Sequence, residues 1–165
     1  MPERAELVER LQQSAERARL LRATTGPVAP DGWPPHIIVG HLVYVEQHVW
    51  QVRLREMASV DLPVWEWWEP SGVDWAGLYG HRTWDEMVEE LVVVRSATTA
   101  YLRGLDAAGW SRKGRHDVFG EITVAALCEE ILTHDHEHLR QIAGGREPAA
   151  AELGNAGQPK VRPST

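Results

Sequence analysis

Three histidines lie close together within residues 133–138. Successive residues of a helix turn by about 100°, so residues four apart share one face. His134 and His138 would therefore continue the apolar face of a helix, whereas His136 would lie on the opposite side, toward water. Two imidazoles at this spacing can bind one divalent metal ion. They can equally be core residues that hydrogen bond to neighbours, and the pair alone does not decide between these interpretations.

A third imidazole would change the balance, and an earlier helical segment offers two on its inward face, His41 and His48. Gly40 next to His41 leaves room for a neighbour or a ligand. His41 and His48 are two turns apart, so one ion is not expected to use both. A site with three imidazoles keeps open coordination positions, as catalytic sites do. It could lower the pKa of a bound water or hold a thiol as thiolate, and imidazole suits Zn, Ni and Fe alike.

Candidates for a general base are the carboxylates closest in sequence to these histidines: Glu46, Asp135 and Glu137. Asp135 lies about 100° around the helix from His134, where it could orient a neighbouring group or be an exposed helix carboxylate. Glu46 is expected to face a flank of its helix, where it could pair with Arg53 or with an adjacent helix. Cys128 has no basic neighbour, so we interpret it as a small buried residue rather than a nucleophile.

Four helical segments would position these side chains, because apolar residues recur in them every three or four residues. The segments are approximately 3–23, 34–57, 84–109 and 124–143. Pro34 or Pro35 suits a first helical turn, Thr83 with Glu86 fits a capping box, and Thr123 fits an N-cap. No clear strand pattern is present, although residues 118–122 could include one short extended piece. The sequence therefore predicts an all-α four-helix bundle, in which metal sites are commonly built from facing helices.

The connection between the second and third helices, residues 58–82, is long and contains four tryptophans, Trp65, Trp67, Trp68 and Trp75. Four tryptophans are too apolar for a disordered segment, so we expect the connection to fold back over the bundle. It could form a lid or pocket wall over the histidines. The interpretation we favour here is that the rings cap the core or a subunit interface.

Composition limits the other possibilities. The chain of 165 residues is long enough for one domain, which we place at residues 1–143, with residues 144–165 as a flexible tail rich in Ala, Gly and Pro. A net charge of −7 with no basic run argues against nucleic-acid binding. One cysteine allows no internal disulfide, and no apolar run suits a secretory signal or a membrane span. We therefore expect a cytoplasmic protein.

The order of these motifs resembles the DinB-like superfamily of four-helix bundles. The resemblance spans approximately residues 3–143 and includes His41-Leu42 followed by Glu46, a Trp-Pro turn before that helix, and a third helix that contains Arg95. Gly120 through Thr123 then leads into the histidine-rich helix. The resemblance implies that the metal ligands are three histidines: His41, His134 and His138.

Some members of this superfamily are metal-dependent transferases that use low-molecular-weight thiols such as bacillithiol, mycothiol or glutathione, and a related group includes a mycothiol-dependent maleylpyruvate isomerase. The resemblance thus implies a thiol-dependent transferase that acts on a small molecule. The alternatives are a hydrolase that uses metal-bound water, and a non-catalytic dimeric bundle that binds metal. We expect a homodimer in either case. Nothing in the sequence selects a particular thiol or acceptor.

Overall fold

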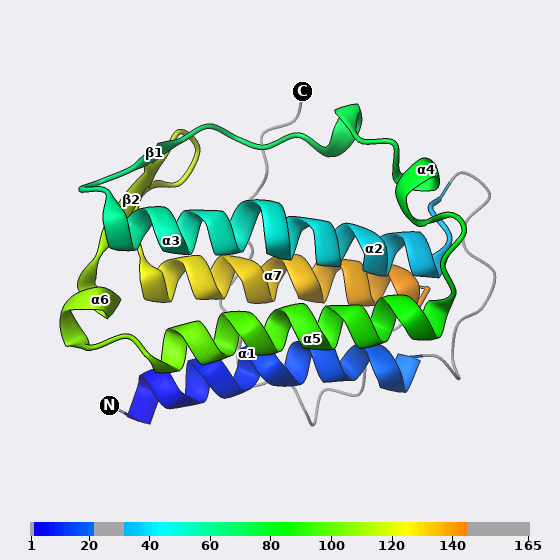
Figure 1. Ribbon diagram of the computed structural model, residues 1–165, viewed down its shortest axis with the longest axis horizontal. Helices are drawn as coiled ribbons and strands as arrows, with labels where there is room; N and C mark the ends of the chain where they lie inside the picture. Colours follow the sequence, from blue (N-terminus) through cyan, green and yellow to red (C-terminus); the bar gives the residue numbers. More distant parts are fainter. Residues whose placement is uncertain (1, 22–31, 145–165) are drawn as a thin grey trace.

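The computed structural model describes residues 2–21 and 32–144, and its main feature is four helical rods that lie side by side (Figure 1). The second rod is continuous and consists of an α-helix, a π-helical turn and a second α-helix. The rods are α1 (Pro2–Leu21), α2 (Pro35–Val45) with η2 (Glu46–Trp50) and α3 (Gln51–Ser59), α5 (Trp84–Arg103) and α7 (Val124–Ile142). The predicted all-α four-helix bundle is confirmed. The predicted tail lies, except for Gly144, outside the described residues, as do residues 22 and 23 of the first helix.

The rods are not arranged in the order of the chain. The helix α1 packs mainly against α5 and α7, and α2 packs against the same two helices. The second rod therefore meets α7, which places the segment around His41 opposite the histidine-rich helix. None of the described helices is both long enough and apolar enough to cross a membrane.

Local sequence signals set the helix ends. Thr83 and Glu86 form the predicted capping box, in which each side chain accepts a hydrogen bond from the backbone N–H of the other. Thr123 caps α7 by accepting a hydrogen bond from the N–H of Ala126. The prediction that the third helix continues to about residue 109 is wrong, because α5 ends at Arg103. The short helix α6 (Ala107–Ser111) follows, and its N-cap Asp106 accepts from a backbone N–H.

A small sheet, which the sequence did not predict as a whole, closes one end of the bundle. Its strands are β1 (Val64–Trp65), β2 (Lys113–His116) and β3 (Gly120–Thr123). The strand β1 pairs in parallel with β2, and β2 pairs antiparallel with β3. The extended piece expected at 118–122 is thus partly correct, because β3 starts at Gly120 and the preceding residues form the turn. At Gly114 the Trp65 ring occupies the space that a Cβ would need, only 2.1 Å away, so these strands require glycine there.

The connection between α3 and α5 folds back along the outside of the second rod, as expected (Figure 1). It contains β1, the short 3-10 helix η3 (Pro70–Gly72) and the helix α4 (Trp75–Tyr79), which packs on α2. The indoles of Trp65 and Trp75 are buried, so this part of the connection does cover the core.

The π-helical turn η2 corrects the predicted face of the second helix. In this turn the N–H of Gln51 donates to the carbonyl of Glu46, five residues back rather than four. The additional residue rotates everything that follows by about 100° relative to a regular α-helix. His48, which we expected to point inward, is therefore exposed, as is Val52 one turn further on, and Arg53 is buried.

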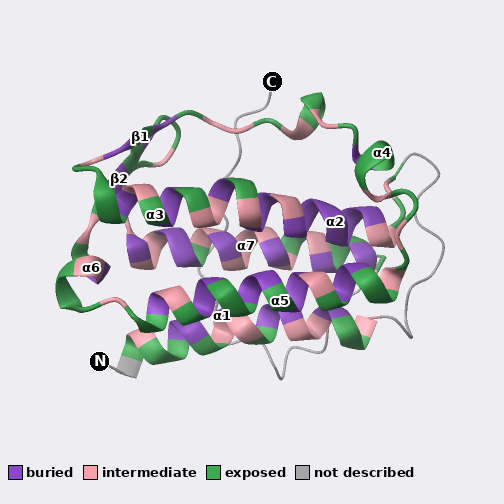
Figure 2. Ribbon diagram, in the orientation of Figure 1, coloured by how far each residue is buried: buried purple, intermediate pink, exposed green. Residues whose placement is uncertain are grey.

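The buried residues, coloured purple in Figure 2, include two apolar clusters, and a polar layer lies between these clusters along the rods. One cluster lies toward the sheet and includes Leu11, Met57 and Leu102. The other includes Leu42 and Leu91 and lies toward the start of α2. Between them lie buried polar side chains contributed by all four rods, among them Ser14, Glu46, Arg95, Thr98 and Asp135.

Candidate metal centre

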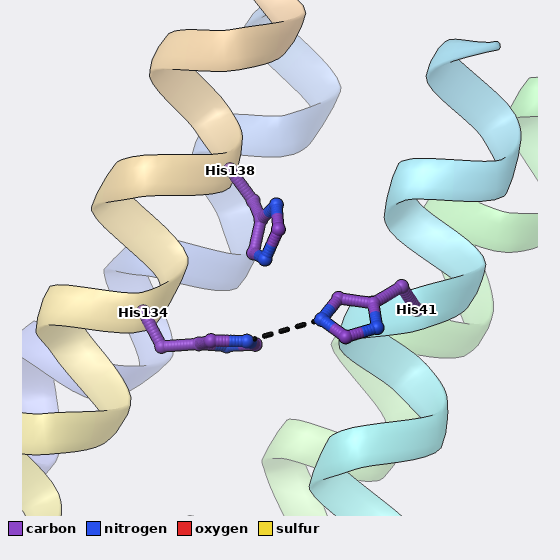
Figure 3. A group of neighbouring side chains, drawn as sticks. All are labelled: His41, His134 and His138. Carbon is purple, nitrogen blue, oxygen red and sulfur yellow. Dashed lines mark hydrogen bonds between the residues drawn. The ribbon is translucent and has the colours of Figure 1, made fainter. Parts of the chain in front are cut away.

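Three imidazoles from two rods converge at one point in the bundle. His41 lies on α2 and is 3% exposed, and His134 and His138 lie one turn apart on α7 and are half-buried. Each ring offers one nitrogen, and these nitrogens all lie within 4.8 Å of one another. The Nε2 atoms of His41 and His134 are 3.1 Å apart. Figure 3 shows the three rings pointing into the space between the two helices.

The geometry and the chemistry of the donors both fit a divalent metal ion. Two nitrogens that bind one tetrahedral ion at about 2.1 Å each are separated by roughly 3.4 Å. The observed separations, from 3.1 Å up to at most 4.8 Å, need only small side-chain movements to match this value. The ring centroids of the three histidines are 4.6 to 5.1 Å apart in every pairing. The ligand set that the sequence suggested is therefore brought together by the fold.

Gln141 is a residue of this centre that sequence reasoning missed. It follows His138 by three residues on α7, and its Oε1 lies 3.1 Å from His138 Nδ1. If Nδ1 carries the proton and donates to this oxygen, Nε2 of His138 is the nitrogen with the lone pair that a metal ion requires. The i, i+3 spacing on the histidine face was the available signal.

Tryptophan rings surround the histidines. His41 contacts Trp33, Trp68 and Trp75, with ring centroids 5.4, 6.2 and 5.0 Å away. Trp50, from the π-helical turn, contacts His134 at 5.8 Å. The lid or pocket-wall interpretation, which we ranked second, therefore describes part of the tryptophan-rich connection correctly.

The three imidazoles line one side of an open pocket of about 410 Å³, a volume typical of small-molecule sites. Indoles and aliphatic side chains form most of its surface. The complete lining is Gly32, Trp33, His41, Val45, Val49, Trp50, Trp67, Trp68, Pro70, His134, His138 and Gln141.

The carboxylates proposed as general bases do not line this pocket. Glu46 and Asp135 are both buried and both bind Arg95, which reaches them from α5. Arg95 donates to Glu46 at 3.0 and 2.9 Å and to Asp135 at 2.8 and 3.1 Å. Glu46 thus pairs with an adjacent helix and not with Arg53, and the interpretation of Asp135 as an exposed carboxylate is wrong. Glu137 is exposed.

In this polar layer, burial and the oppositely charged neighbours shift the pKa of a buried group in opposite directions. Burial raises the pKa of Glu46 above its ordinary value, although Arg95 and the Thr98 hydroxyl, which donates to Glu46, both act to lower it. Burial likewise lowers the pKa of Arg95, but the two carboxylates outweigh it and leave that pKa raised. The layer is therefore a closed structural ion network rather than a reactive acid or base. An arginine within the apolar face of the third helix was its signal in the sequence.

The single cysteine is confirmed as a buried residue. Burial raises the pKa of the Cys128 thiol to about 12, so the thiol stays protonated at neutral pH and is a poor nucleophile.

Comparisons with known proteins agree with this fold. The family described as the DinB superfamily matches residues 3–142. Among solved structures, YfiT from Bacillus subtilis is similar to this chain with a TM-score of 0.72 and 17% sequence identity, over 87% of this chain and 86% of that one. YfiT is described as a probable metal-dependent hydrolase with an unusual four-helix bundle topology. No curated protein sequence matches the chain significantly.

Proposed function

The chain belongs to the DinB superfamily, and on that basis we propose that it is a metal-dependent enzyme that acts on a small molecule. The observation that carries the proposal is the position of the three histidines. Their nitrogens converge on one point, and that point opens into a pocket large enough for a substrate. A structural metal site is normally closed by four protein ligands, whereas three ligands beside a cavity suit catalysis.

Each part of the site has a role in this proposal. His41, His134 and His138 would hold a divalent ion, and Gln141 would fix the orientation of His138. When bound, the ion supplies a positive charge that favours the deprotonated form of a small nucleophile at neutral pH. The indole walls would limit the access of water to one side of a bound substrate and would hold it beside the imidazoles.

A thiol-dependent transfer is the first reaction we propose. Its support is the absence of a carboxylate among the described residues that line the pocket, because Arg95 engages both Glu46 and Asp135. A thiol is a stronger acid than water and ionises beside a cation without a protein base. Low-molecular-weight thiols of the kind used by other DinB-like enzymes are therefore suitable second substrates.

A metal-dependent hydrolysis is the second reaction. Its support is the similarity of the fold to YfiT, which is itself described as a probable metal-dependent hydrolase. A hydrolase would activate water at the same three histidines and would need no thiol.

One experiment tests the proposal and separates the two reactions. The purified chain is loaded with Zn²⁺, Ni²⁺ or Fe²⁺, and each form is incubated with electrophiles and esters, with and without bacillithiol, mycothiol or glutathione. Metal-dependent loss of thiol supports the transferase, and metal-dependent product formation without thiol supports the hydrolase. A chain that binds no metal stoichiometrically contradicts the proposal. A metal-loaded dimer that is inactive across both panels would favour the non-catalytic dimeric bundle.

A further inference from the structure

The pocket beside the histidines has mainly apolar walls, unlike an active site that is lined by charged side chains. Apart from the imidazoles, its described surface is mostly indole and aliphatic, and it includes Trp33, Trp50, Trp67, Trp68, Val45 and Val49. Within the parts of the chain that the structure describes, none of the lining residues is an acid, a lysine or an arginine.

The indoles approach the imidazoles from different elements and with different tilts. The ring of Trp68 is stacked with that of His41, with an interplanar angle of 28°. Trp33 is tilted by 51° relative to the same imidazole, and Trp50 meets His134 edge-on at 77°. A ligand between these rings would meet both faces and edges of aromatic groups, which is the surrounding that a flat aromatic ring prefers.

Two of these walls are held in place from behind. Trp67 contacts His116 and Phe119 of the β2–β3 hairpin, each with ring centroids 6.0 Å away. Its backbone N–H donates to Asp117 at 3.0 Å, and its indole N–H donates to Glu69. Trp68 stacks on Tyr44 at 5.9 Å. The walls are thus largely pre-formed, so a ligand would lose little binding energy in ordering them.

The charged groups near the pocket are directed elsewhere. Arg53 packs over the rings of Trp50 and Trp65 at 5.5 and 5.4 Å, and its guanidinium donates to the carbonyl of Glu66. Arg95 is engaged by Glu46 and Asp135 within the polar layer. An anionic group lying against the indoles would therefore lose its hydration without gaining a cationic side chain among the described lining residues, and that loss is costly.

From these observations we propose that the substrate, or its leaving group, is an uncharged planar aromatic group that binds between the indoles while its reacting bond faces the histidines. This proposal rests on the proposed function only in stating that a bond of the ligand reacts beside the histidines. The preference for the aromatic group itself depends only on the walls. A divalent ion at the histidines would add to the selection by repelling cationic groups, which indoles alone could attract.

The test measures binding to the full-length chain by calorimetry, with and without one equivalent of Zn²⁺. Three probes of similar size are compared: 2-naphthol, its saturated counterpart decahydro-2-naphthol, and 6-hydroxynaphthalene-2-sulfonate. For the metal-free chain we expect the Kd of 2-naphthol to be about fivefold lower than that of either other probe, since aromatic rings pair favourably with the indoles and the sulfonate must be desolvated. Equal affinities for the three probes would overturn the proposal.

Variants locate the binding. Trp68→Leu and Trp50→Leu remove walls contributed by two different elements, and each should raise the Kd of 2-naphthol about tenfold. Trp84→Leu is the matched control, because Trp84 is also half-buried but does not line the pocket. Two wall variants are used so that one poorly folded protein, identified by circular dichroism, does not decide the result. An equal change in all three variants would contradict the proposal.

The outcome is independent of the proposed enzymatic function. Selective binding of 2-naphthol by a chain that takes up no metal would retain the aromatic pocket and refute the metal-dependent enzyme. Stoichiometric metal binding without selectivity for 2-naphthol would refute the aromatic substrate and leave the enzyme proposal intact.

Discussion

Replacing Arg95 by methionine tests whether the polar layer holds the four rods together. The guanidinium makes four hydrogen bonds to the carboxylates of two residues, Glu46 and Asp135, and neither residue is more than 3% exposed. Its removal would leave Glu46 and Asp135 buried without the cation that compensates them. Removing one partner of a buried ion pair costs about 3–5 kcal/mol, a large part of the roughly 5–15 kcal/mol by which domains are stable.

The measurement is chemical unfolding in urea at pH 7, followed by circular dichroism. Arg10→Met is the matched control, because Arg10 also makes two hydrogen bonds to one carboxylate, at 2.8 and 3.1 Å to Glu129, but at the protein surface. We expect this control to change stability little, since exposed pairs are screened by water. A loss of less than about 1 kcal/mol for Arg95→Met, or an equal loss in the control, would refute the structural role of the layer.

The dependence on pH provides a second criterion. Burial already raises the pKa of Glu46, and without Arg95 one of the groups that lower it is gone. The carboxyl of the variant then takes up a proton as the pH falls through this raised pKa, and the uncompensated charge disappears. The loss of stability in Arg95→Met is thus expected to be larger at pH 8 than at pH 5. A triple variant with Glu46→Gln and Asp135→Asn should recover most of the loss at both pH values.

Three further predictions concern the metal centre and its surroundings. The variant His138→Ala should lose stoichiometric metal binding, measured by elemental analysis, while its far-UV circular dichroism spectrum stays helical. The control variant His136→Ala should bind as much metal as the parent. Equal metal content in the two variants would contradict the ligand assignment. Cys128, with a pKa raised to about 12, should fail to react with a thiol reagent at pH 8 in the folded protein and should react fully in guanidinium chloride, so fast reaction without denaturant would show that it is accessible. The variant Gly40→Ala should lower the free energy of unfolding, measured by urea titration, by about 1–3 kcal/mol, because its Cβ would lie 2.6 Å from the Tyr79 ring. Unchanged stability would show that α4 moves to make room for the added methyl group.

Local patterns in the sequence were sufficient to predict that four helices form and that two histidines pair on α7, but not where the third helix ends. The spacing of His134 and His138 depends only on helical periodicity, and Thr83 with Glu86 depends only on capping chemistry. The addition of His41 relied on the family resemblance, because His48 has the same residue type and the same apparent face. The choice between them followed from resemblance rather than from periodicity.

The residues that were misplaced depend on long-range structure. One extra residue in the π-helical turn moved His48 to the surface, and the burial of Glu46 depends on its partner Arg95 from another rod. The partnership of Arg95 with Glu46 and Asp135 joins residues 49 and 40 positions apart in the chain. Such pairs become apparent only once the order of packing of the rods is known.

The separation of the core into two apolar clusters has a consequence for how this fold can change over time. Side chains in the cluster near the sheet, such as Leu102, do not belong to the cluster that includes Leu42. Substitutions in distant, unshared surroundings add their effects rather than compounding them. Selection for a new substrate could therefore remodel one half of the molecule while the other half preserves the reserve of stability that such remodelling consumes.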